Sequence, residues 1–328
     1  MTAWLRLAVP LLRYKDCGMK IAVIGAGGVG GYFGGRLAMA GHDVAMIARG
    51  RHLAAMRAAR LRVRSVKGDF TAAVTAVEDP AEIGPCEVVL FCVKSYDTEA
   101  AAARLPPLLT ADTAVISLQN GIDNEEKLAG VIGTRHVAGG AAFIFSSITE
   151  PGVITHTGGP ARIVFGEMDG KRSGRLVRLL SACHEAGIDS EIPSDIRVVL
   201  WTKYAFICAT AGMTAAVRLP LGNIRDCAES WAMFARIAAE VIALGRAEGV
   251  PLPDNATDQL IAFGAGLEPG SFSSLHHDMT TGKQMELETL HGTVIRRAAR
   301  LGVAVPACEA IYGILRPWAL RNERRGHG

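Results

Sequence analysis

The sequence lacks the features of disulfide-rich, membrane-spanning and nucleic-acid-binding proteins. Its seven cysteines are odd in number and include no C-x-x-C pair, which argues against a disulfide framework and indicates a reducing compartment. Charges or glycines interrupt the apolar stretches, so we expect no membrane partner and a cytoplasmic location. The net charge is only +3 and the basic residues are scattered, which argues against nucleic acid as a partner.

A metal site is also not indicated by the potential ligands. The sequence His276-His277-Asp278 places three of them in succession, but neighbouring side chains on a helix point about 100° apart. No further ligand stands at a suitable spacing. We therefore predict a protein without a bound metal.

The sequence does contain enough apolar residues for two cores, since 49% of its 328 residues are hydrophobic. Strand and helix patterns alternate in the first part, whereas after Pro193 the periodicity is almost wholly helical. We therefore expect an α/β fold in which an N-terminal Rossmann-like domain (19–192) precedes an all-helical domain (193–320) and a tail (321–328). Residues 1–18 are expected to lie outside the fold, as an upstream start or loose extension or, alternatively, a poor signal peptide.

The most informative motif follows the apolar run at 21–24. Gly25-Ala26-Gly27-Gly28-Val29-Gly30 is a G-x-G-x-x-G that closes a strand and opens a helix over 29–40. Its first glycine permits the tight turn, its second lets backbone approach a pyrophosphate, and its third lets the helix pack on the strand. The helix N-terminus then offers free N–H groups to the phosphates. These residues predict a bound dinucleotide.

The end of the second strand, over 44–48, indicates which dinucleotide is bound. NAD-selective sites place an acidic residue there for the ribose hydroxyls, but this sequence continues Arg49-Gly50-Arg51-His52. A guanidinium at Arg49 can bind the 2′-phosphate of NADP(H) with two parallel hydrogen bonds. The alternative interpretation is that Arg49 and Arg51 are ordinary solvated charges of a loop.

Polar residues end two further predicted strands. Lys94-Ser95 follows the strand over 87–93, and Gln119-Asn120-Gly121 follows the strand over 114–118. Ligands of open α/β sheets bind at the carboxyl ends of the strands. The remaining expected strands are 61–66, 71–77, 139–147, 152–157, 161–165 and 188–192, and the remaining helices are 98–105, 172–186, 195–211, 228–248, 253–264, 276–300 in pieces, and 306–320.

From Met19 to Trp318 the sequence resembles the ketopantoate reductases (2-dehydropantoate 2-reductases). The resemblance implies reduction of ketopantoate to pantoate with NADPH, on the way to pantothenate and coenzyme A. It rests on the order and spacing of several motifs: Gly25–Gly30, Ala48-Arg49-Gly50, Val93-Lys94-Ser95, Gln119-Asn120-Gly121, Leu200-Trp201-Thr202-Lys203, Ser271–Ser274 and Gln284-Met285-Glu286.

The same resemblance implies roles for individual residues. Lys203 becomes the catalytic lysine and Glu286 the acid that binds and orients the substrate. Ser274 is assigned to the substrate carboxylate, and Lys94 and Asn120 to the cofactor or substrate near the nicotinamide. The chemistry agrees, because hydride transfer to a ketone leaves negative charge on the oxygen, which a lysine can neutralise or protonate.

One departure from the family bears on the substrate. The family helix reads Lys-x-x-x-Asn-x-x-x-Asn, but here Lys203 is followed at these positions by Ile207 and Ala211. Either other polar residues replace the amides, or the pocket accepts a different, more apolar 2-oxo acid, as in D-2-hydroxyacid dehydrogenases of this fold. A non-catalytic NADP(H)-binding sensor is the alternative of another class. The long apolar helices are compatible with a homodimer.

Overall fold

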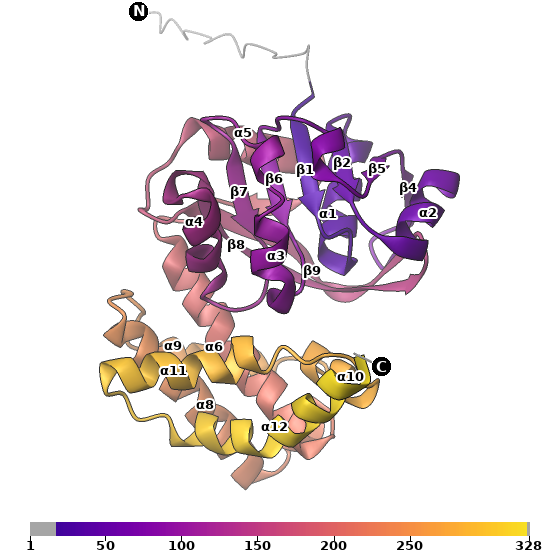
Figure 1. Cartoon of the computed structure of the whole chain (residues 1–328). Coiled ribbons are helices and arrows are strands. Elements are labelled where there is room, and N and C mark those ends of the chain that lie inside the picture. Colours follow the sequence, from indigo (N-terminus) through magenta and orange to yellow (C-terminus); the bar gives the residue numbers. More distant parts are fainter. Residues whose placement is uncertain (1–17, 327–328) are drawn as a thin grey trace, which may run out of the picture.

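A computed structural model describes residues 18–326 of the chain; the predicted extension at 1–18 therefore lies, apart from its last residue, outside the described residues. The described chain has a sheet-containing N-terminal part and a helical part from residue 196 onward, which Figure 1 shows as two layers joined by α6 (Ile196–Val217). The predicted fold class is thus confirmed.

The N-terminal part is built on one mixed sheet. Its strand order is β4-β3-β9-β8-β7-β6-β1-β2-β5, with β10 beside β9. The strands from β5 to β8 in this order pair in parallel, so their carboxyl ends meet at one edge. The bounds are β1 (Lys20–Ile24), β2 (Asp43–Ile47), β3 (Leu61–Ser65), β4 (Phe70–Ala72), β5 (Thr75–Val77), β6 (Val88–Phe91), β7 (Ala114–Ser117), β8 (Val137–Glu150), β9 (Val153–Glu167) and β10 (Asp189–Glu191).

Two strand predictions were wrong in detail. The single strand expected over 71–77 is divided: β4 pairs antiparallel with β3, whereas β5 pairs parallel with β2 at the opposite edge of the sheet. The two strands expected over 152–157 and 161–165 are one long strand, β9. Its Gly-Gly-Pro segment stays within the strand, at a place where the register with β8 shifts. Local patterns do not reveal which distant strand each segment joins.

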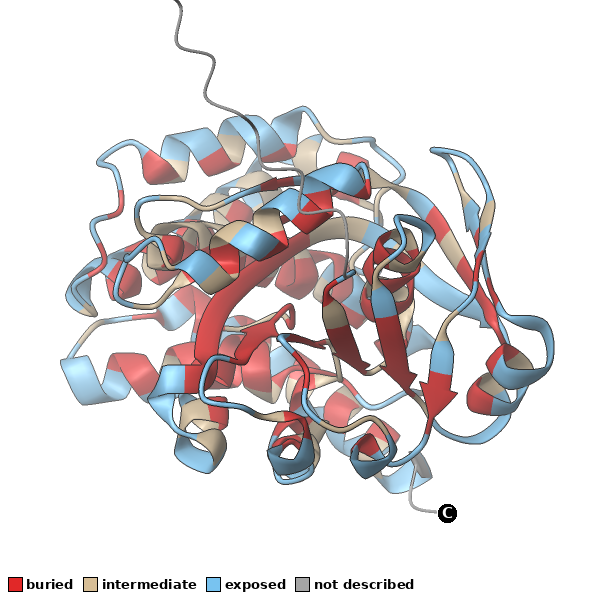
Figure 2. Ribbon diagram, turned by 90° about the horizontal axis from the view of Figure 1, so that it is seen from above, coloured by how far each residue is buried: buried red, intermediate tan, exposed pale blue. Residues whose placement is uncertain are grey.

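Helices cover both faces of this sheet, and Figure 2 shows its buried strands between helices whose outer turns are exposed. Side chains of α1 and α5 contribute to the core on one face, and those of α3 and α4 to the core on the other. The sequence patterns did not predict α2 and α4. The bounds are α1 (Gly28–Met39), α2 (Gly50–Ala59), α3 (Thr98–Ala102), α4 (Asn124–Ile132) and α5 (Gly174–Glu185), with short 3-10 turns at 80–82, 95–97, 106–108 and 134–136.

The helical part has its own large hydrophobic core, centred on α6 and α8. The last helix ends at Gly326 and not at Leu320 as expected, because Asn322 is buried against the preceding helices and keeps the chain helical. After α6 follow α7 (Leu221–Arg225), α8 (Ala228–Ala247), α9 (Ala256–Ala265), α10 (Ser274–Thr280), a π-helical turn (Glu288–Gly292), α11 (Thr293–Leu301) and α12 (Pro306–Gly326).

Helix α6 corrects the expectation that no apolar stretch is long enough to cross a membrane. It is 22 residues long with a mean hydropathy of 1.2 in its most apolar window, and it is the one helix among residues 18–326 that meets this criterion. Its first turns pack on β8 and β9 and the rest lies in the core of the helical part. The length and apolar composition of α6 are therefore explained by its position in the protein core.

Candidate active site

The glycine turn between β1 and α1 has one side against the protein and one side open. Gly25 has a φ of +93°, and a Cβ there would lie 2.8 Å from the backbone nitrogen of Val93. A Cβ at Gly27 would meet no atom of the described residues within 4 Å. Gly27 is also the N-cap of α1, and no side chain caps this end. The open side and the uncapped helix end fit a dinucleotide pyrophosphate.

The other residues of the motif have packing roles. A Cβ at Gly30 would lie 2.3 Å from the carbonyl oxygen of Gly25, and one at Gly28 would lie 2.2 Å from the carbonyl oxygen of Ser146 on β8. Val29 is half-buried and packs against the sheet core. These three positions hold α1 close to the sheet and so fix the open turn in place.

Arg49 lies directly beyond β2, where the sequence predicts it, as the N-cap of α2. Its side chain is 83% exposed, and its guanidinium forms an ion pair with the carboxylate of Asp97 at 3.2 Å. The sequence did not indicate this acidic neighbour. An exposed pair of this kind contributes little to stability, so the guanidinium can turn to a ligand at small cost.

Lys94 joins the two parts of the molecule. Its ammonium lies 2.9 Å from a carboxylate oxygen of Glu286 and 3.0 Å from one of Asp278, both in the helical part. Burial lowers the pKa of Lys94, but the two carboxylates outweigh burial and the net shift is upward. Lys94 is therefore a permanent cation across the cleft. Sequence reasoning considered Asp278 only as a metal ligand and missed this contact.

Glu286 is held on both of its oxygens. One accepts from Lys94, and the other accepts from the backbone N–H of Ser95 at 3.0 Å and from its hydroxyl at 2.8 Å. Thr289 in turn donates to the Ser95 hydroxyl at 2.6 Å. Burial raises the pKa of Glu286, but Lys94 and the Ser95 donors outweigh it, and the net pKa is lowered. Glu286 is thus a fixed anion at the cleft.

Lys203 has the opposite environment. It lies in the second turn of α6 with its ammonium 5.5 Å from the ring centroid of Phe143, and within residues 18–326 it makes no hydrogen bond or ion pair. Burial lowers the pKa of Lys203 to about 8, against the opposing charges of Glu125 and Glu286. This amine can exchange its proton near neutral pH.

Glu125, in the first turn of α4, is a further titratable group that sequence reasoning missed. It is 5% exposed, and one of its carboxylate oxygens has no hydrogen-bond partner among the described residues. Burial raises the pKa of Glu125 to about 7. Its charge acts on Lys203 more strongly than that of Glu286 does. Only its position shortly after the predicted Gln-Asn-Gly segment could have pointed to it.

Asn120 and Lys203 line one small cavity of about 10 Å³. Ile207 also lines it, so the family amide at this position is replaced by an apolar wall. Ala211 is 1% exposed and packs in the helical core, away from that lining. The cavity thus brings together the lysine, two amides and an isoleucine; its full lining is Gln119, Asn120, Gly121, Leu200, Lys203, Tyr204 and Ile207.

Ser274 begins α10 and is exposed, one helical turn before Asp278. Side chains four residues apart share a helix face, so Ser274 lies on the face that meets Lys94. Its neighbour Ser273 is the N-cap of the helix and accepts from the backbone N–H of His276. The structure therefore places Ser274 exposed on the helix that contacts Lys94, while Lys203 lines the small cavity beside Asn120.

A glycine turn at the carboxyl edge of a parallel sheet, with a half-buried lysine on the helical part, is the arrangement of a dinucleotide-dependent oxidoreductase. Residues 21–170 match the ketopantoate reductase PanE/ApbA family, and residues 195–319 match its C-terminal domain. An uncharacterized oxidoreductase, YkpB of Bacillus subtilis, is 32% identical over 90% of this chain and 98% of its own length. The 2-dehydropantoate 2-reductase of Caulobacter vibrioides is 31% identical over 92% and 99%. The chain belongs to the ketopantoate reductase family.

Solved structures agree with this assignment. A PanE/ApbA family ketopantoate reductase from Ralstonia eutropha is 33% identical, covers 93% of this chain and 100% of its own, and superposes with a TM-score of 0.85. A D-mandelate dehydrogenase bound to NADH and anilino(oxo)acetate has a TM-score of 0.84, covering 93% of this chain and 99% of its own, at 20% identity. At that identity the second likeness concerns the fold alone.

Proposed function

We propose that the protein reduces a 2-oxo acid with NADPH, with ketopantoate as the first candidate substrate and pantothenate synthesis as its setting. The observation that carries the proposal is the half-buried Lys203, which has no ion-pair partner among the described residues and lies within the electrostatic influence of the anchored Glu286. The bound cofactor would supply the hydride, which is accepted by C2 of the substrate. The ketone oxygen takes the proton from Lys203 Nζ, and a 2-hydroxy acid and NADP⁺ result.

The remaining residues bind and orient in this proposal. The turn of Gly25 and Gly27 would hold the pyrophosphate, and Arg49 the 2′-phosphate. Glu286 orients the substrate, Asn120 binds near the nicotinamide, and Ser274 receives the substrate carboxylate. The apolar surroundings of Lys203 keep part of its population ready to give up a proton.

Ile207 favours a second candidate, a more apolar 2-oxo acid. It lines the cavity beside Lys203 at a position where the family amide could bond a substrate hydroxyl. An isoleucine side chain offers no partner to that hydroxyl, and an unpaired hydroxyl costs about 1–3 kcal/mol. The reaction type is the same for both candidates, while the side chain of the preferred acid differs.

One experiment separates these candidates. NADPH oxidation is followed by absorbance with ketopantoate and with 2-oxo acids of increasing apolar bulk, in the wild type and in Ile207→Asn. Preference for ketopantoate in the wild type supports the first candidate. Preference for an apolar acid that Ile207→Asn shifts toward ketopantoate supports the second. Absence of turnover with every acid would contradict both and favour a sensor.

Cofactor choice is tested separately through Arg49. We expect Arg49→Asp to weaken NADPH binding by at least about tenfold and NADH binding much less, because a carboxylate there repels the 2′-phosphate. Fluorescence titration of both cofactors measures the difference. Equal losses for NADPH and NADH would show that Arg49 does not contact the 2′-phosphate.

A further inference from the structure

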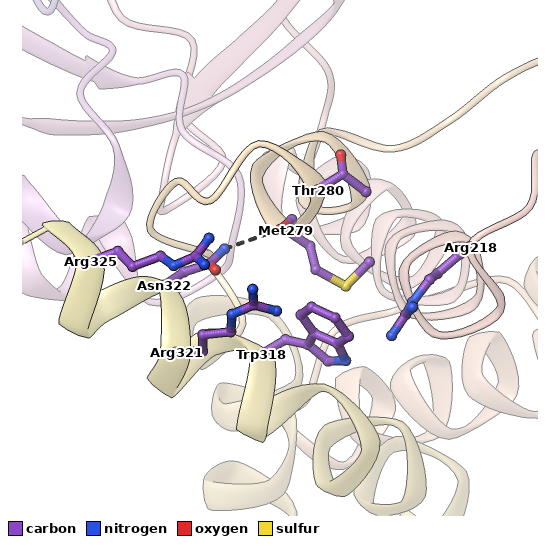
Figure 3. Close-up of a pocket in the computed structure, with 7 residues that line it drawn as sticks. All are labelled: Arg218, Met279, Thr280, Trp318, Arg321, Asn322 and Arg325. Carbon is purple, nitrogen blue, oxygen red and sulfur yellow. Dashed lines mark hydrogen bonds between the residues drawn. The ribbon is translucent and has the colours of Figure 1, made fainter.

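A second hollow lies in the helical part and shares no lining residue with the cavity beside Lys203. It has a volume of about 230 Å³, and Figure 3 shows three arginine side chains and one tryptophan around it. The lining comes from the C-terminal end of α6, from α10 and from α12: Arg218, Met279, Thr280, Trp318, Arg321, Asn322 and Arg325.

The charges around this pocket are unbalanced. The guanidinium groups of Arg218, Arg321 and Arg325 form no ion pair or hydrogen bond with any residue of the described chain. Most other arginines of α11 and α12 are engaged; Arg316, for example, contacts Glu288 and Glu323. Three guanidinium groups around one hollow repel one another unless an anion lies between them. The pocket lining itself contains no carboxylate.

Trp318 holds two of these guanidinium groups without using their hydrogen-bond donors. The Cζ atom of Arg218 lies 4.2 Å from its ring centroid and that of Arg321 lies 5.2 Å from it (Figure 3). Cation–π contacts fix the orientation of a guanidinium and leave its N–H groups free. The donors are therefore oriented before any ligand arrives.

Arg218 also occupies a backbone conformation that favours glycine. It follows α6 as its C-cap with a φ of +60°, in the left-handed region. A non-glycine residue there is strained, and such strain concentrates at binding sites. From this position the guanidinium of Arg218 contacts the ring of Trp318 at the pocket.

The floor of the pocket is rigid. Asn322 is 2% exposed, and its amide donates to the carbonyl oxygens of Lys283 at 2.8 Å, Asp278 at 3.2 Å and Met279 at 3.3 Å. These bonds tie α12 to the end of α10. Asp278 itself points to Lys94, so α10 separates the pocket from the cleft. The two sites are neighbours with different linings.

We propose that this pocket is an anion site for the phosphate or pyrophosphate group of a small metabolite. Guanidinium groups bind such oxyanions through paired hydrogen bonds, and three of them suit two or more negative charges. The volume of about 230 Å³ is below the usual range for whole drug-sized ligands, so the anionic group enters and the rest of the metabolite extends outward. Because the guanidinium groups lie against Trp318, the ring is a support for them and not a stacking surface for a base.

The test is titration of the full-length protein with inorganic pyrophosphate, followed by calorimetry and by tryptophan fluorescence. Three variants alter the pocket: Arg218→Gly, Arg321→Gln and Arg325→Gln. Arg324→Gln is the matched control, because Arg324 is a neighbouring exposed arginine of α12 that does not line the pocket. Arg218→Gly is compatible with a positive φ, so it removes the guanidinium without disturbing the helix end.

We expect saturable binding that each pocket variant weakens about tenfold or more and that Arg324→Gln changes less than about twofold. The fluorescence change is expected to disappear in Trp318→Phe. Absence of saturable binding, or equal weakening by Arg324→Gln, would overturn the proposal. Binding that none of the pocket variants affects would also overturn it, because the pyrophosphate would then occupy the glycine turn. None of these outcomes depends on the proposed reductase activity.

Discussion

Two lysines of the candidate active site, Lys94 and Lys203, lie in opposite environments. On the side of the sheet, Lys94 is bound by two carboxylates from the helical part, and its pKa is raised. On the side of α6, Lys203 has no ion-pair partner within the described chain, and burial lowers its pKa to about 8. A partner fixes a lysine as a cation, whereas burial without a partner lets it exchange a proton. On this basis we propose that Lys94 serves binding and that Lys203 transfers the proton.

Replacement of Lys203 by methionine is expected to have the largest effect and tests the difference between the two lysines most directly. Methionine retains most of the volume but removes the proposed proton donor. Since general acids contribute about 10²–10⁴-fold, we expect kcat to fall by about a thousandfold. Steady-state NADPH oxidation at saturating substrate gives kcat, and fluorescence titration establishes that cofactor binding is retained.

Lys94→Met is the matched variant for this measurement. It removes a cation that we assign to binding, so we expect KM to rise and kcat to fall by less than about tenfold. If both methionine variants lowered kcat to the same extent, the two lysines would share one role. The difference in their environments would then have no catalytic consequence.

Glu286→Gln removes one of the two ion pairs of Lys94. Glutamine keeps an oxygen for the Ser95 donors but loses the charge that faces Lys94. Because Lys94 is 42% exposed, water compensates part of the loss, and we expect the free energy of unfolding to fall by about 1–2 kcal/mol. We also expect kcat/KM to fall by about tenfold to a hundredfold through KM. Thermal unfolding and steady-state kinetics measure the two effects, and an unchanged KM would contradict the assigned role of Glu286.

Local sequence patterns predicted the elements of this site better than its contacts. The G-x-G-x-x-G turn, the strand before Lys94 and the helix containing Lys203 follow from short-range periodicity, and the structure contains them. Asp278 could not be predicted as a partner of Lys94, because the two are separated by 184 positions and belong to different parts of the molecule. Its position beside two histidines led us to consider it only as a metal ligand, a role that we rejected.

The same limit applies to Glu125 and to the edge strands. Nothing in the sequence around Glu125 distinguishes a buried carboxyl from the exposed Glu126 next to it. Likewise, the residues of β4 and β5 form one plausible strand until the sheet assigns them to opposite edges. Tertiary packing decides burial and pairing, and these determine which groups of a given type have unusual pKa values.

The pH dependence of reduction tests whether the ionisation of Lys203 controls the rate. The rate kcat/KM is expected to fall as pH rises through about 8, because Lys203 then loses the proton that it must donate. The negative charge of Glu125 favours protonated Lys203. Glu125→Gln removes that charge and should therefore lower the midpoint of the profile, with a rate loss of several-fold to about tenfold at pH 8.

Glu126→Gln is the control for this profile. Glu126 lies beside Glu125 in the sequence, but its side chain is 67% exposed and paired with Arg297. We expect its midpoint to match that of the wild type. If Glu125→Gln did not change the midpoint of the profile, the buried carboxyl would have no influence on the pKa of Lys203. If the pH profile of Lys203→Met matched that of the wild type, the ionisation would belong to another group.

Asp278→Asn is expected to have the smallest effect of these substitutions. It tests whether the ion pair with Glu286 is sufficient to hold Lys94 in position. Asparagine keeps an oxygen that can accept from the ammonium, and the Asp278 carbonyl that accepts from Asn322 is unaffected. Lys94 also retains its ion pair with Glu286 at 2.9 Å, so it stays charged and in place. We therefore expect KM to rise by about twofold to fivefold, with kcat and the midpoint of the pH profile unchanged. Steady-state kinetics beside Glu286→Gln provide the comparison. An effect as large as that of Glu286→Gln would mean that Lys94 needs both charges to stay in position, because one buried carboxylate with donors from Ser95 would then be insufficient to hold it.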